Sequence, residues 1–356
     1  MSHTRATAHQ PTGGSPSDAI EVYCPVPLQI HPAGAEEVDT FAVDWLVNHG
    51  LFTDTTPVTR MNIGLLIAAA MPFTTTAFVK AFTTYCYWAF AWDDHLDHLA
   101  EEPATLIAHV GEVAHALQQP TAVPIADDLW VRTGRAVREL LFDCLSPTAQ
   151  AEFRHTNLYW ITGELWKRAI QIREHPPNVG NYLRMRWAKL GGPVLAAATG
   201  PGGGYPLSYQ HLQEPLILAF TQTVLLSCGL LNDMGSSLKE TTTQSHVNLM
   251  AALDHDHTLG GPAALAQTYQ LYERALCLMP HLQQRLLADP RPEVARYASE
   301  LPQWIPATVH FTATSARYHQ HTAPALTIRT TPTLWDPTDL TPPPYPQISW
   351  WWNQLT

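Results

Sequence analysis

Three carboxylates stand close together where an apolar stretch of the sequence ends. Residues 86–92 are all apolar, and Asp93, Asp94 and Asp97 follow them. Residues four apart share one face of a helix, so Asp93 and Asp97 should point the same way. The same stripe continues back through Phe90, Ala89, Cys86 and Phe82. Acidic residues often end a helix simply by reaching water, but carboxylate oxygens grouped in this way also suit a hard divalent cation such as Mg²⁺.

A second group of oxygen-bearing side chains stands in residues 225–240, LLSCGLLNDMGSSLKE. Asn232, Ser236 and Glu240 are spaced four apart, which places them on one helix stripe about 12 Å long. Lys239 stands beside them and would meet an anion. The stripe also carries Leu225, Cys228 and Gly229. An ordinary polar helix face explains this pattern by itself, but two apolar helices that each end in a metal-type cluster predict metals held between two walls of one cavity.

Both clusters need helices to position them, and the hydrophobic pattern predicts such helices along most of the chain. Apolar residues recur at three- and four-residue spacing, while the alternation typical of strands is rare. We therefore predict an all-α fold, a single domain whose helices are joined by short loops. The expected helical stretches are 36–50, 60–100, 104–118, 126–143, 148–175, 178–198, 207–239, 246–253, 262–288 and 291–318.

The two ends of the chain differ from this helical region. Residues 1–20 are polar and rich in Gly, Ser and Pro, which predicts a disordered N-terminal tail. Residues 321–356 form a C-terminal tail rich in Thr, Pro and Trp, and its prolines exclude a regular helix. Trp335 and the tryptophans at 350–352 are costly to leave in water. Two readings stay open for this tail: a loose end, or a segment packed in part on the body or on a partner.

Composition narrows the class of protein. Hydrophobic residues make up 46% of the 356 positions, and the net charge of −11 disfavours a nucleic-acid partner. The five cysteines are scattered without a CxxC pair, which argues against a disulfide framework or a zinc site and favours a reducing cytoplasm. The longest apolar stretch, residues 63–73, is too short to span a membrane, and residues 1–18 lack the apolar core of a signal peptide. We expect a soluble cytoplasmic protein.

Taken together, the two clusters resemble the motifs of a known family. DDHLD and the pattern Asn232-Asp233-x-x-Ser236-x-x-Lys239-Glu240 resemble the aspartate-rich and NSE motifs of bacterial class I terpene synthases, and here they stand about 140 residues apart, as in that family. Arg186 matches the family's diphosphate-sensing arginine, and Arg317-Tyr318 matches its Arg-Tyr pair. The resemblance extends over about residues 22 to 320.

One segment departs from the family pattern. Lys189 stands where the family often has Asp, Thr or Ser, and Leu190 stands where a glycine carbonyl often lies at a helix break. Gly191-Gly192-Pro193 follows, so we expect a break near Gly191. Which carbonyl acts there as the effector stays open.

The resemblance implies a fold, a ligand set and a reaction. It implies an α-helical bundle around a central apolar cavity, formed by a catalytic domain at residues 21–320. It implies a linear prenyl diphosphate substrate held by three Mg²⁺ ions on Asp93, Asp94, Asp97, Asn232, Ser236 and Glu240. Arg186, Lys239, Arg317 and Tyr318 would contact the diphosphate as catalytic residues. The substrate pocket would be lined by Phe82, Cys86, Ala89, Phe90, Gly191, Leu225, Cys228, Gly229, Trp304 and Phe311.

The predicted activity is ionisation and cyclisation of an all-trans prenyl diphosphate with release of pyrophosphate. Small residues along the inferred walls favour geranylgeranyl diphosphate and a diterpene, with farnesyl diphosphate and a sesquiterpene as the alternative. A chain-elongating prenyltransferase would carry a second DDxxD motif, and a non-catalytic isoprenoid-diphosphate binder would carry a broken metal motif. A helical protein-interaction module would need neither cluster. Family members are often homodimers, and the oligomeric state and the product skeleton stay open.

Overall fold

The computed structural model of this chain describes residues 20–99, 102–173, 175–205, 207–242, 247–319, 328–331, 333–334 and 336–356. Side chains are described over these ranges except at positions 57, 201, 237–242, 319 and 328. The α-helices are α1 (Ala35–Asn48), α2 (Thr56–Thr59), α3 (Ile63–Ala70), α4 (Thr76–His98), α5 (Pro103–Gln118), α6 (Leu129–Phe142), α7 (Pro147–Arg173), α8 (Val179–Lys189), α9 (Gly192–Thr199), α10 (Tyr209–Leu212), α11 (Pro215–Thr242), α12 (Leu249–His257), α13 (Gly261–Leu287), α14 (Pro292–Glu300), α15 (Trp304–Thr314), α16 (Ala316–His319) and α17 (Pro346–Ser349). Three short 3₁₀ helices are η1 (Pro201–Gly203), η2 (Leu301–Gln303) and η3 (Trp350–Leu355), and two strands are β1 (Ile20–Tyr23) and β2 (Ile328–Thr331).

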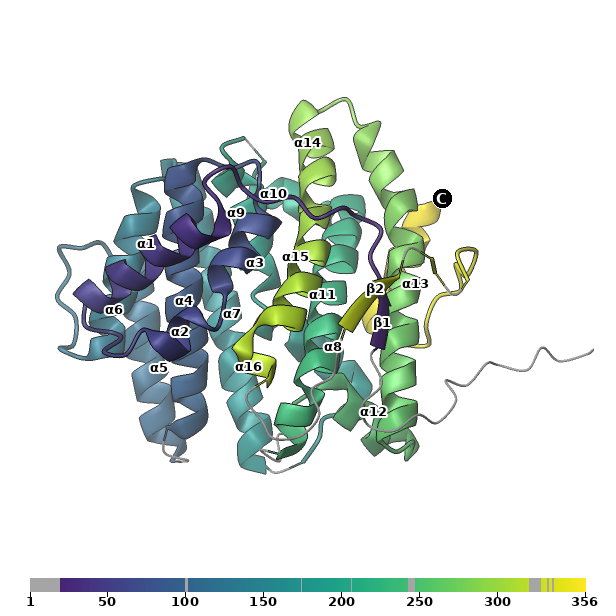
Figure 1. The fold of residues 1–356 in the computed structure, drawn as a ribbon, viewed down its shortest axis with the longest axis horizontal. Coiled ribbons are helices and arrows are strands. Elements are labelled where there is room, and N and C mark those ends of the chain that lie inside the picture. Colours follow the sequence, from purple (N-terminus) through teal and green to yellow (C-terminus); the bar gives the residue numbers. More distant parts are fainter. Residues whose placement is uncertain are drawn as a thin grey trace, which may run out of the picture.

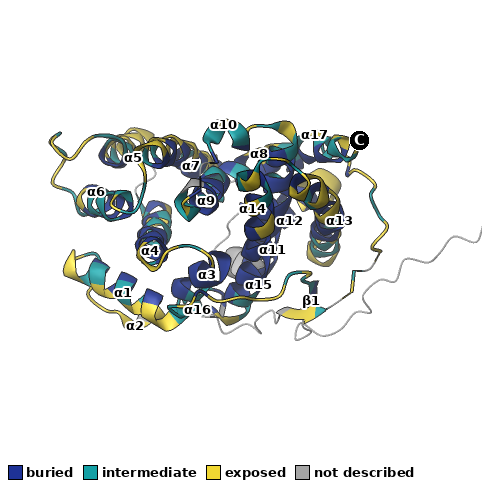
Figure 2. Ribbon diagram, turned by 90° about the horizontal axis from the view of Figure 1, so that it is seen from above, coloured by how far each residue is buried: buried dark blue, intermediate teal, exposed yellow. Residues whose placement is uncertain are grey.

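The helices form a bundle whose two long apolar helices, α4 and α11, carry the two predicted clusters (Figure 1). Seen from above, α3 and α15 lie on one side of the space between them, and α7, α8 and α9 lie on the other (Figure 2). Helix α11 packs on α8, α9, α13 and α15, and α4 packs on α1, α3, α6 and α7. The buried faces of these helices point inward, so the core surrounds the middle of the bundle. The predicted all-α fold class is confirmed.

Helix α4 begins at a capped turn and is buried along most of its length. The Thr75 side chain accepts a hydrogen bond from the Phe78 amide, which satisfies one of the free donors at the helix start. Residues 78–88 are all buried except Lys80, which is half-buried, whereas the end of the helix at Asp93 and Asp97 is partly open. The carboxylates therefore stand where the core meets solvent.

Prolines and a glycine break four of the predicted helical stretches, one of them at 207–239, where α10 ends at Leu212 and α11 begins at Pro215. The stretch at 60–100 contains two helices rather than one, because Pro72 lies between α3 and α4 and restricts the residue before it. The stretch at 291–318 is interrupted at η2, which contains Pro302, and again at Ser315. The break expected near Gly191 is present between α8 and α9, where Gly191 has a φ of 70°.

The two strands join segments from opposite ends of the chain. Strand β1 pairs in parallel with β2, in the register Ile20 to Ile328 and Tyr23 to Thr331. The periodicity of the sequence did not indicate this pair, because each strand has only four residues. Apart from Ile20, the predicted disordered tail at 1–20 lies outside the described residues.

The end of the C-terminal tail packs on the body of the protein. Trp351 and Trp352 are buried, and the Trp351 indole donates a hydrogen bond to the Gln222 side chain of α11, 2.9 Å away. This segment includes the short helices α17 and η3, although we expected no regular helix there. Trp335 lies outside the described residues. Of the two readings of the tail, packing on the body is correct for this part.

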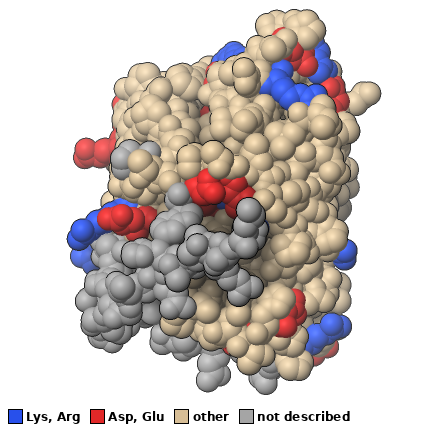
Figure 3. All heavy atoms as spheres, turned by 90° about the vertical axis from the view of Figure 1, so that its right-hand side faces the viewer, with Lys and Arg blue, Asp and Glu red and all other residues tan. Residues whose placement is uncertain are grey.

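Among the residues that the structure describes, one helix is long and apolar enough to cross a membrane, and most of it is buried inside the fold. The span Pro215–Ser236 of α11 has the length and the apolar composition of a membrane-spanning helix, but 72% of the span's apolar window is buried in the protein. It is therefore a core helix of the bundle. On the face seen in Figure 3, the described Lys and Arg side chains lie in separate groups among mostly uncharged residues.

Candidate active site

A cavity of about 760 Å³ lies between α4 and α11 and holds most of the predicted site residues. Its lining comes from α3, α4, α7, α8, α9, α11, α15 and α16. The predicted residues that line it are Cys86, Ala89, Phe90, Asp93, Asp94, Asp97, Arg186, Gly191, Cys228, Asn232, Ser236, Trp304, Phe311, Arg317 and Tyr318. Two clusters that are far apart in sequence thus face the same cavity.

Three residues predicted for the pocket wall do not line the cavity. Phe82 is fully buried one helical turn before Cys86, and its ring stacks on Phe78 and Tyr85 with centroids 5.7 Å apart. Leu225 is likewise fully buried in the core. The Gly229 backbone is covered by Arg186, whose guanidinium donates to the Gly229 carbonyl at 3.0 Å. Residues on one helix stripe point the same way, but the stripe does not show how far along the helix the cavity extends. Phe82 and Leu225 lie in the core beyond the cavity, and Gly229 lies behind the Arg186 side chain.

The carboxylates of the first cluster pair with cationic side chains from other helices. Asp94 forms a two-pronged ion pair with Arg317, at 2.5 and 2.7 Å. Asp93 binds Lys167, and the nitrogens of Lys189 and Arg317 lie 3.6 Å from its second oxygen. Burial raises the pKa of Asp93, but the surrounding cations outweigh that effect and hold this pKa well below its ordinary value. Asp93 therefore stays a carboxylate in a buried place.

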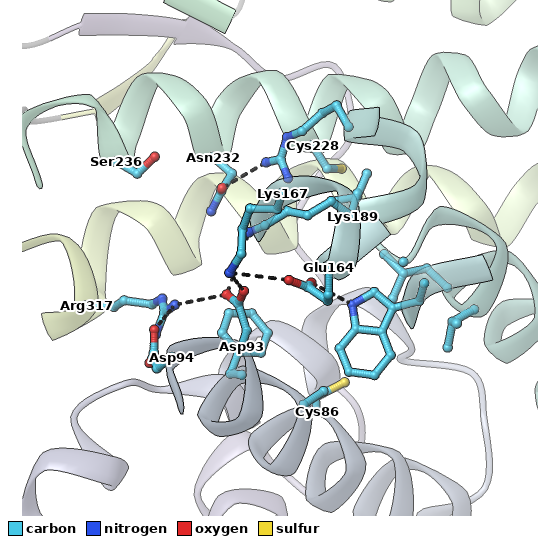
Figure 4. A pocket seen from close by; sticks show the side chains of 18 of the residues that line it. Cys86, Asp93, Asp94, Glu164, Lys167, Lys189, Cys228, Asn232, Ser236 and Arg317 are labelled. Atoms are coloured by element: carbon cyan, nitrogen blue, oxygen red, sulfur yellow. Dashed lines mark hydrogen bonds and ion pairs between the residues drawn. The ribbon is translucent and has the colours of Figure 1, made fainter. Parts of the chain in front are cut away.

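Two residues of α7, Glu164 and Lys167, also belong to this charged cluster, and the sequence reasoning missed both. The Lys167 nitrogen contacts Asp93 and also lies 2.7 Å from Asp97 and 3.3 Å from Glu164 (Figure 4). Burial lowers the pKa of Lys167, but the three acids outweigh it and raise this pKa above its ordinary range. Burial and the charge of Asp93 together raise the pKa of Glu164 to about 8. The sequence does contain a signal that could have indicated these two residues. It is a polar stripe on an otherwise apolar helix face, and its members are Glu164, Lys167, Arg168 and Gln171.

The second wall is organised around Arg186. Its guanidinium donates to the Asn232 side-chain oxygen at 2.9 Å and pairs with Asp233 at 3.0 Å. The Asn232 amide in turn donates to the Tyr318 hydroxyl at 2.5 Å. Burial raises the pKa of Asp233, and the charge of Arg186 partly offsets this. The predicted arginine, the amide of the second cluster and the predicted tyrosine therefore form one connected wall.

The structure describes the backbone, but not the side chains, of two predicted site residues. The backbone of Lys239 and Glu240 belongs to α11, one turn beyond Ser236, but their side chains lie outside the described residues. Ser236 lines the cavity, and its hydroxyl lies 3.5 Å from the Asp233 carbonyl. The ligand role of Glu240 and the anion contact of Lys239 therefore stay predictions.

The deeper part of the cavity is apolar and aromatic. The Trp304 indole donates to the Thr199 hydroxyl at 2.9 Å, which satisfies its one polar atom. Phe311 meets Phe90 and Tyr318 edge to face, with centroids 6.1 and 5.7 Å apart. The Arg317 guanidinium lies 5.2 Å from the centre of the Phe90 ring. The aromatic faces thus connect the apolar pocket to its charged rim.

The donor atoms at the rim suit a hard divalent cation. Carboxylates from α4 and the amide and hydroxyl oxygens of Asn232 and Ser236 on α11 face one cavity, and oxygen donors of this kind suit Mg²⁺. Over the part of the chain that the structure describes, no three His, Cys, Asp or Glu side chains are already gathered in a metal-binding arrangement. The reason is visible in the ion pairs, since Lys167 holds Asp93 and Asp97 while Arg317 holds Asp94.

Two known proteins match this sequence over nearly the whole chain. Bonnadiene synthase of Allokutzneria albata is 27% identical over 95% of this chain and 98% of its own length. Tsukubadiene synthase of Streptomyces tsukubensis is 28% identical over 93% of this chain and 98% of its own length. The match therefore includes both walls of the cavity.

Solved structures support the fold. The SVS_A2 protein from ancestral sequence reconstruction superimposes with a TM-score of 0.79 at 24% identity, over 95% of this chain and 99% of its own. An α-eudesmol synthase superimposes with a TM-score of 0.73 at 17% identity, over 83% of this chain and 99% of its own. The family model described as "Terpene synthase family 2, C-terminal metal binding" matches residues 84–276, more than half of the chain and both clusters. The chain thus belongs to the bacterial class I terpene synthases and is a terpene cyclase, a lyase that acts on a prenyl diphosphate.

Proposed function

We propose that this cyclase ionises geranylgeranyl diphosphate in the presence of Mg²⁺ and closes the resulting cation to a cyclic diterpene. The observation that carries the proposal is one cavity with an apolar, aromatic interior and a rim of carboxylates and cations. Such a rim suits a diphosphate, and such an interior suits a hydrocarbon chain. Both ends of the substrate are thereby accounted for.

The rim residues would orient and hold the leaving group. Bound Mg²⁺, three ions in our proposal, would neutralise negative charge on the departing diphosphate, held by Asp93, Asp94, Asp97, Asn232, Ser236 and Glu240. Arg186 is already fixed by Asn232 and Asp233, so it offers a guanidinium at the rim without further ordering. Arg317, Tyr318 and Lys239 are the further groups that we assign to the diphosphate.

The interior would protect and guide the carbocation. Apolar walls exclude water, which would otherwise quench the cation. Trp304, Phe311 and Phe90 line the cavity, and their ring faces attract positive charge. Trp304 is held by its bond to Thr199, so its ring presents a fixed surface to the substrate.

The length of the substrate is the finer part of the proposal. A relative named diterpene cyclase DtcycA, from a Streptomyces species, is 24% identical over 94% of this chain. Another relative, the 4-epi-cubebol synthase of Streptosporangium roseum, is described as farnesyl diphosphate cyclizing and is 23% identical over 83% of this chain. We favour geranylgeranyl diphosphate because small residues, among them Ala89 and Gly191, line the cavity, and we keep farnesyl diphosphate as the alternative.

The test is a comparison of substrates. Purified protein is incubated separately with geranyl, farnesyl and geranylgeranyl diphosphate, with Mg²⁺ and with EDTA, and extracts are separated by gas chromatography and mass spectrometry. A cyclic C20 product formed only with Mg²⁺ and geranylgeranyl diphosphate is the expected result. A cyclic C15 product from farnesyl diphosphate alone would establish the alternative. Linear, longer diphosphates on addition of isopentenyl diphosphate would point to a prenyltransferase, and binding without turnover would point to a non-catalytic binder.

We also propose a cellular compartment and an oligomeric state for the enzyme. The five cysteines are all free, which is the state expected in a reducing cytoplasm. A homodimer remains our expectation from family resemblance, and light scattering of the purified protein would measure it.

A further inference from the structure

One lysine on α7 stands among the acids where the metal ligands are expected. The Lys167 ammonium contacts Asp93 and Asp97 of α4 and Glu164 of its own helix. Its side chain is only 4% exposed. Figure 4 shows this side chain reaching the space between Asp93 and Asn232, the two walls that carry the predicted ligands. A single cationic group thus joins the carboxylates that a divalent cation would need.

The position of this lysine is built into the fold. A Cβ at Gly163 would lie 2.4 Å from the Lys189 backbone nitrogen, so α7 and α8 are in direct backbone contact next to the lysine. Glu164 is held by the Trp160 indole at 3.0 Å, and Gln171 donates to Asp97 at 3.0 Å. These contacts fix the helix on both sides of Lys167, so its ammonium is directed at Asp93 and Asp97.

The ammonium and a metal ion would compete for the same oxygens. Lys167 uses one oxygen of Asp93 and one of Asp97, and a carboxylate offers a limited number of lone pairs. A divalent cation bound beside the ammonium would also face its repulsion at short range in a largely buried place. A diphosphate changes this balance, because it brings negative charge that both the metal and the ammonium can share.

We propose that Lys167 is an internal counter-ion that keeps divalent cations off Asp93 and Asp97 until a diphosphate is present. It acts through these carboxylates and is therefore a positioning residue rather than a catalytic one. This inference rests on the proposed function, because it takes Asp93 and Asp97 as metal ligands. Its consequence is positive coupling, in which metal and diphosphate each raise the affinity of the protein for the other.

The direct test is metal binding without any diphosphate. The free Mn²⁺ concentration is measured by electron paramagnetic resonance during titration of wild type and Lys167→Met, a variant that keeps most of the side chain and removes its charge. We expect Mn²⁺ to bind at least about tenfold more tightly to Lys167→Met. Lys167→Arg keeps the charge and should bind as weakly as wild type. Lys80→Met, which removes a lysine paired with Glu37 outside the cavity, should leave the affinity unchanged.

Thermal melting separates this role from simple structural support. Removing the ammonium leaves Asp93, Asp97 and Glu164 without their main partner, so Lys167→Met should melt at a lower temperature than wild type in EDTA. Mg²⁺ alone should then raise its melting temperature by more than it raises that of wild type, because at one concentration the more tightly bound ligand stabilises the folded state more. If Lys167 were only structural, the variant would still melt at a lower temperature in EDTA. Mg²⁺ would then raise its melting temperature no more than it raises that of wild type. Where Lys167→Met does not fold, the double variant Glu164→Gln with Lys167→Met, which also removes the acid on α7 beside the ammonium, replaces it in both experiments.

The same titrations repeated with inorganic pyrophosphate distinguish two kinds of failure. Because pyrophosphate chelates Mn²⁺ by itself, binding to the protein is taken as the difference from the same titration without protein, and we expect wild type to bind Mn²⁺ readily in this measure. If neither wild type nor the variants bind Mn²⁺ with pyrophosphate, the metal assignment fails, and with it the proposed function. If wild type binds Mn²⁺ with pyrophosphate but the variants bind it no more tightly without pyrophosphate, only the role of Lys167 is overturned.

Discussion

Arg186 connects three groups of the site before any substrate is present. It donates to the Asn232 side chain and to the Gly229 carbonyl, and it pairs with Asp233. Because Asn232 also donates to Tyr318, a displacement of any member would change the others. At the scale of single residues the rim is therefore a preorganised polar network, with an apolar pocket behind it.

Removing one oxygen ligand from either wall should abolish turnover without unfolding the protein. Asp93→Ala and Asn232→Ala each delete a donor on one wall, so we expect Mg²⁺-dependent product formation to fall by at least about 100-fold. The helical circular dichroism signal should stay that of wild type. Asp44→Ala, an exposed position on α1, is the control and should keep full activity. Wild-type activity in either site variant would refute the metal assignment.

The sequence predicted those residues whose role depends on local spacing. Asp93 with Asp97, and Asn232 with Ser236, were found because four-residue spacing on a helix is visible in one dimension, and all four line the cavity. Lys167 was missed because its role depends on Asp93, which is 74 positions away and on another helix. Phe82 was misplaced because spacing along a stripe does not indicate where the cavity ends.

At the scale of helices, the spacing between α7 and α8 decides where the cations of the rim lie. Gly163 lets the two backbones meet, with the Lys189 nitrogen 2.4 Å from where a Cβ would stand. Helix α7 carries Lys167, and α8 carries Arg186 and Lys189. A change in this spacing would move all three cations relative to Asp93.

We expect Gly163→Ala to damage both stability and activity. The added methyl group would meet backbone atoms, which cannot rotate away, so α8 must shift. The expected cost is about 1–3 kcal/mol in the free energy of unfolding, measured by urea denaturation, together with a fall in turnover. Gly111→Ala on α5 is the matched control, since nothing lies within 4 Å of its added methyl group. That control should be neutral or stabilise the helix, by up to about 1 kcal/mol.

A second helix contact should make stability depend on pH. Asp39 of α1 accepts a hydrogen bond from the Tyr87 hydroxyl of α4 at 2.5 Å and from the Gly64 amide of α3 at 2.8 Å. Burial raises the pKa of Asp39 above its usual value of 3.8, despite both bonds. The folded protein therefore keeps this proton to higher pH than the unfolded chain does, and stability falls as pH rises from 3.8 through the raised pKa.

Asp39→Asn should remove this loss of stability. The amide oxygen still accepts both hydrogen bonds but carries no charge. We expect the melting temperatures of variant and wild type to agree near pH 4, and the variant to melt a few degrees higher at pH 8. A difference that is the same at both pH values would contradict this explanation.

At the scale of the whole molecule, the C-terminal end is part of the core. Trp351 is 2% exposed and bonds to α11, the helix that carries Asn232. The sequence indicated only that these tryptophans are costly to leave in water. The surface that would cover them was not predictable, because it is formed by α8, α11 and α13, which lie far away in sequence.

Trp351→Ala should therefore destabilise the entire protein. Deletion of a buried tryptophan typically costs about 3–5 kcal/mol in the free energy of unfolding. Chemical denaturation of Trp351→Ala should show a loss of that size. Trp166→Ala, which removes a tryptophan that is 36% exposed, should cost clearly less. A loss in Trp351→Ala well below this range would mean that the C-terminal segment contributes little to the core.

The parallel pair β1–β2 has a consequence for the order in which the protein is made. Strand β1 leaves the ribosome early, but its partner residues at 328–331 are synthesised about 300 positions later. At about 5–20 residues per second, β1 waits roughly 15 to 60 s for its partner. The helices between them have that interval in which to fold, and the two strands can pair only after residues 328–331 have been synthesised.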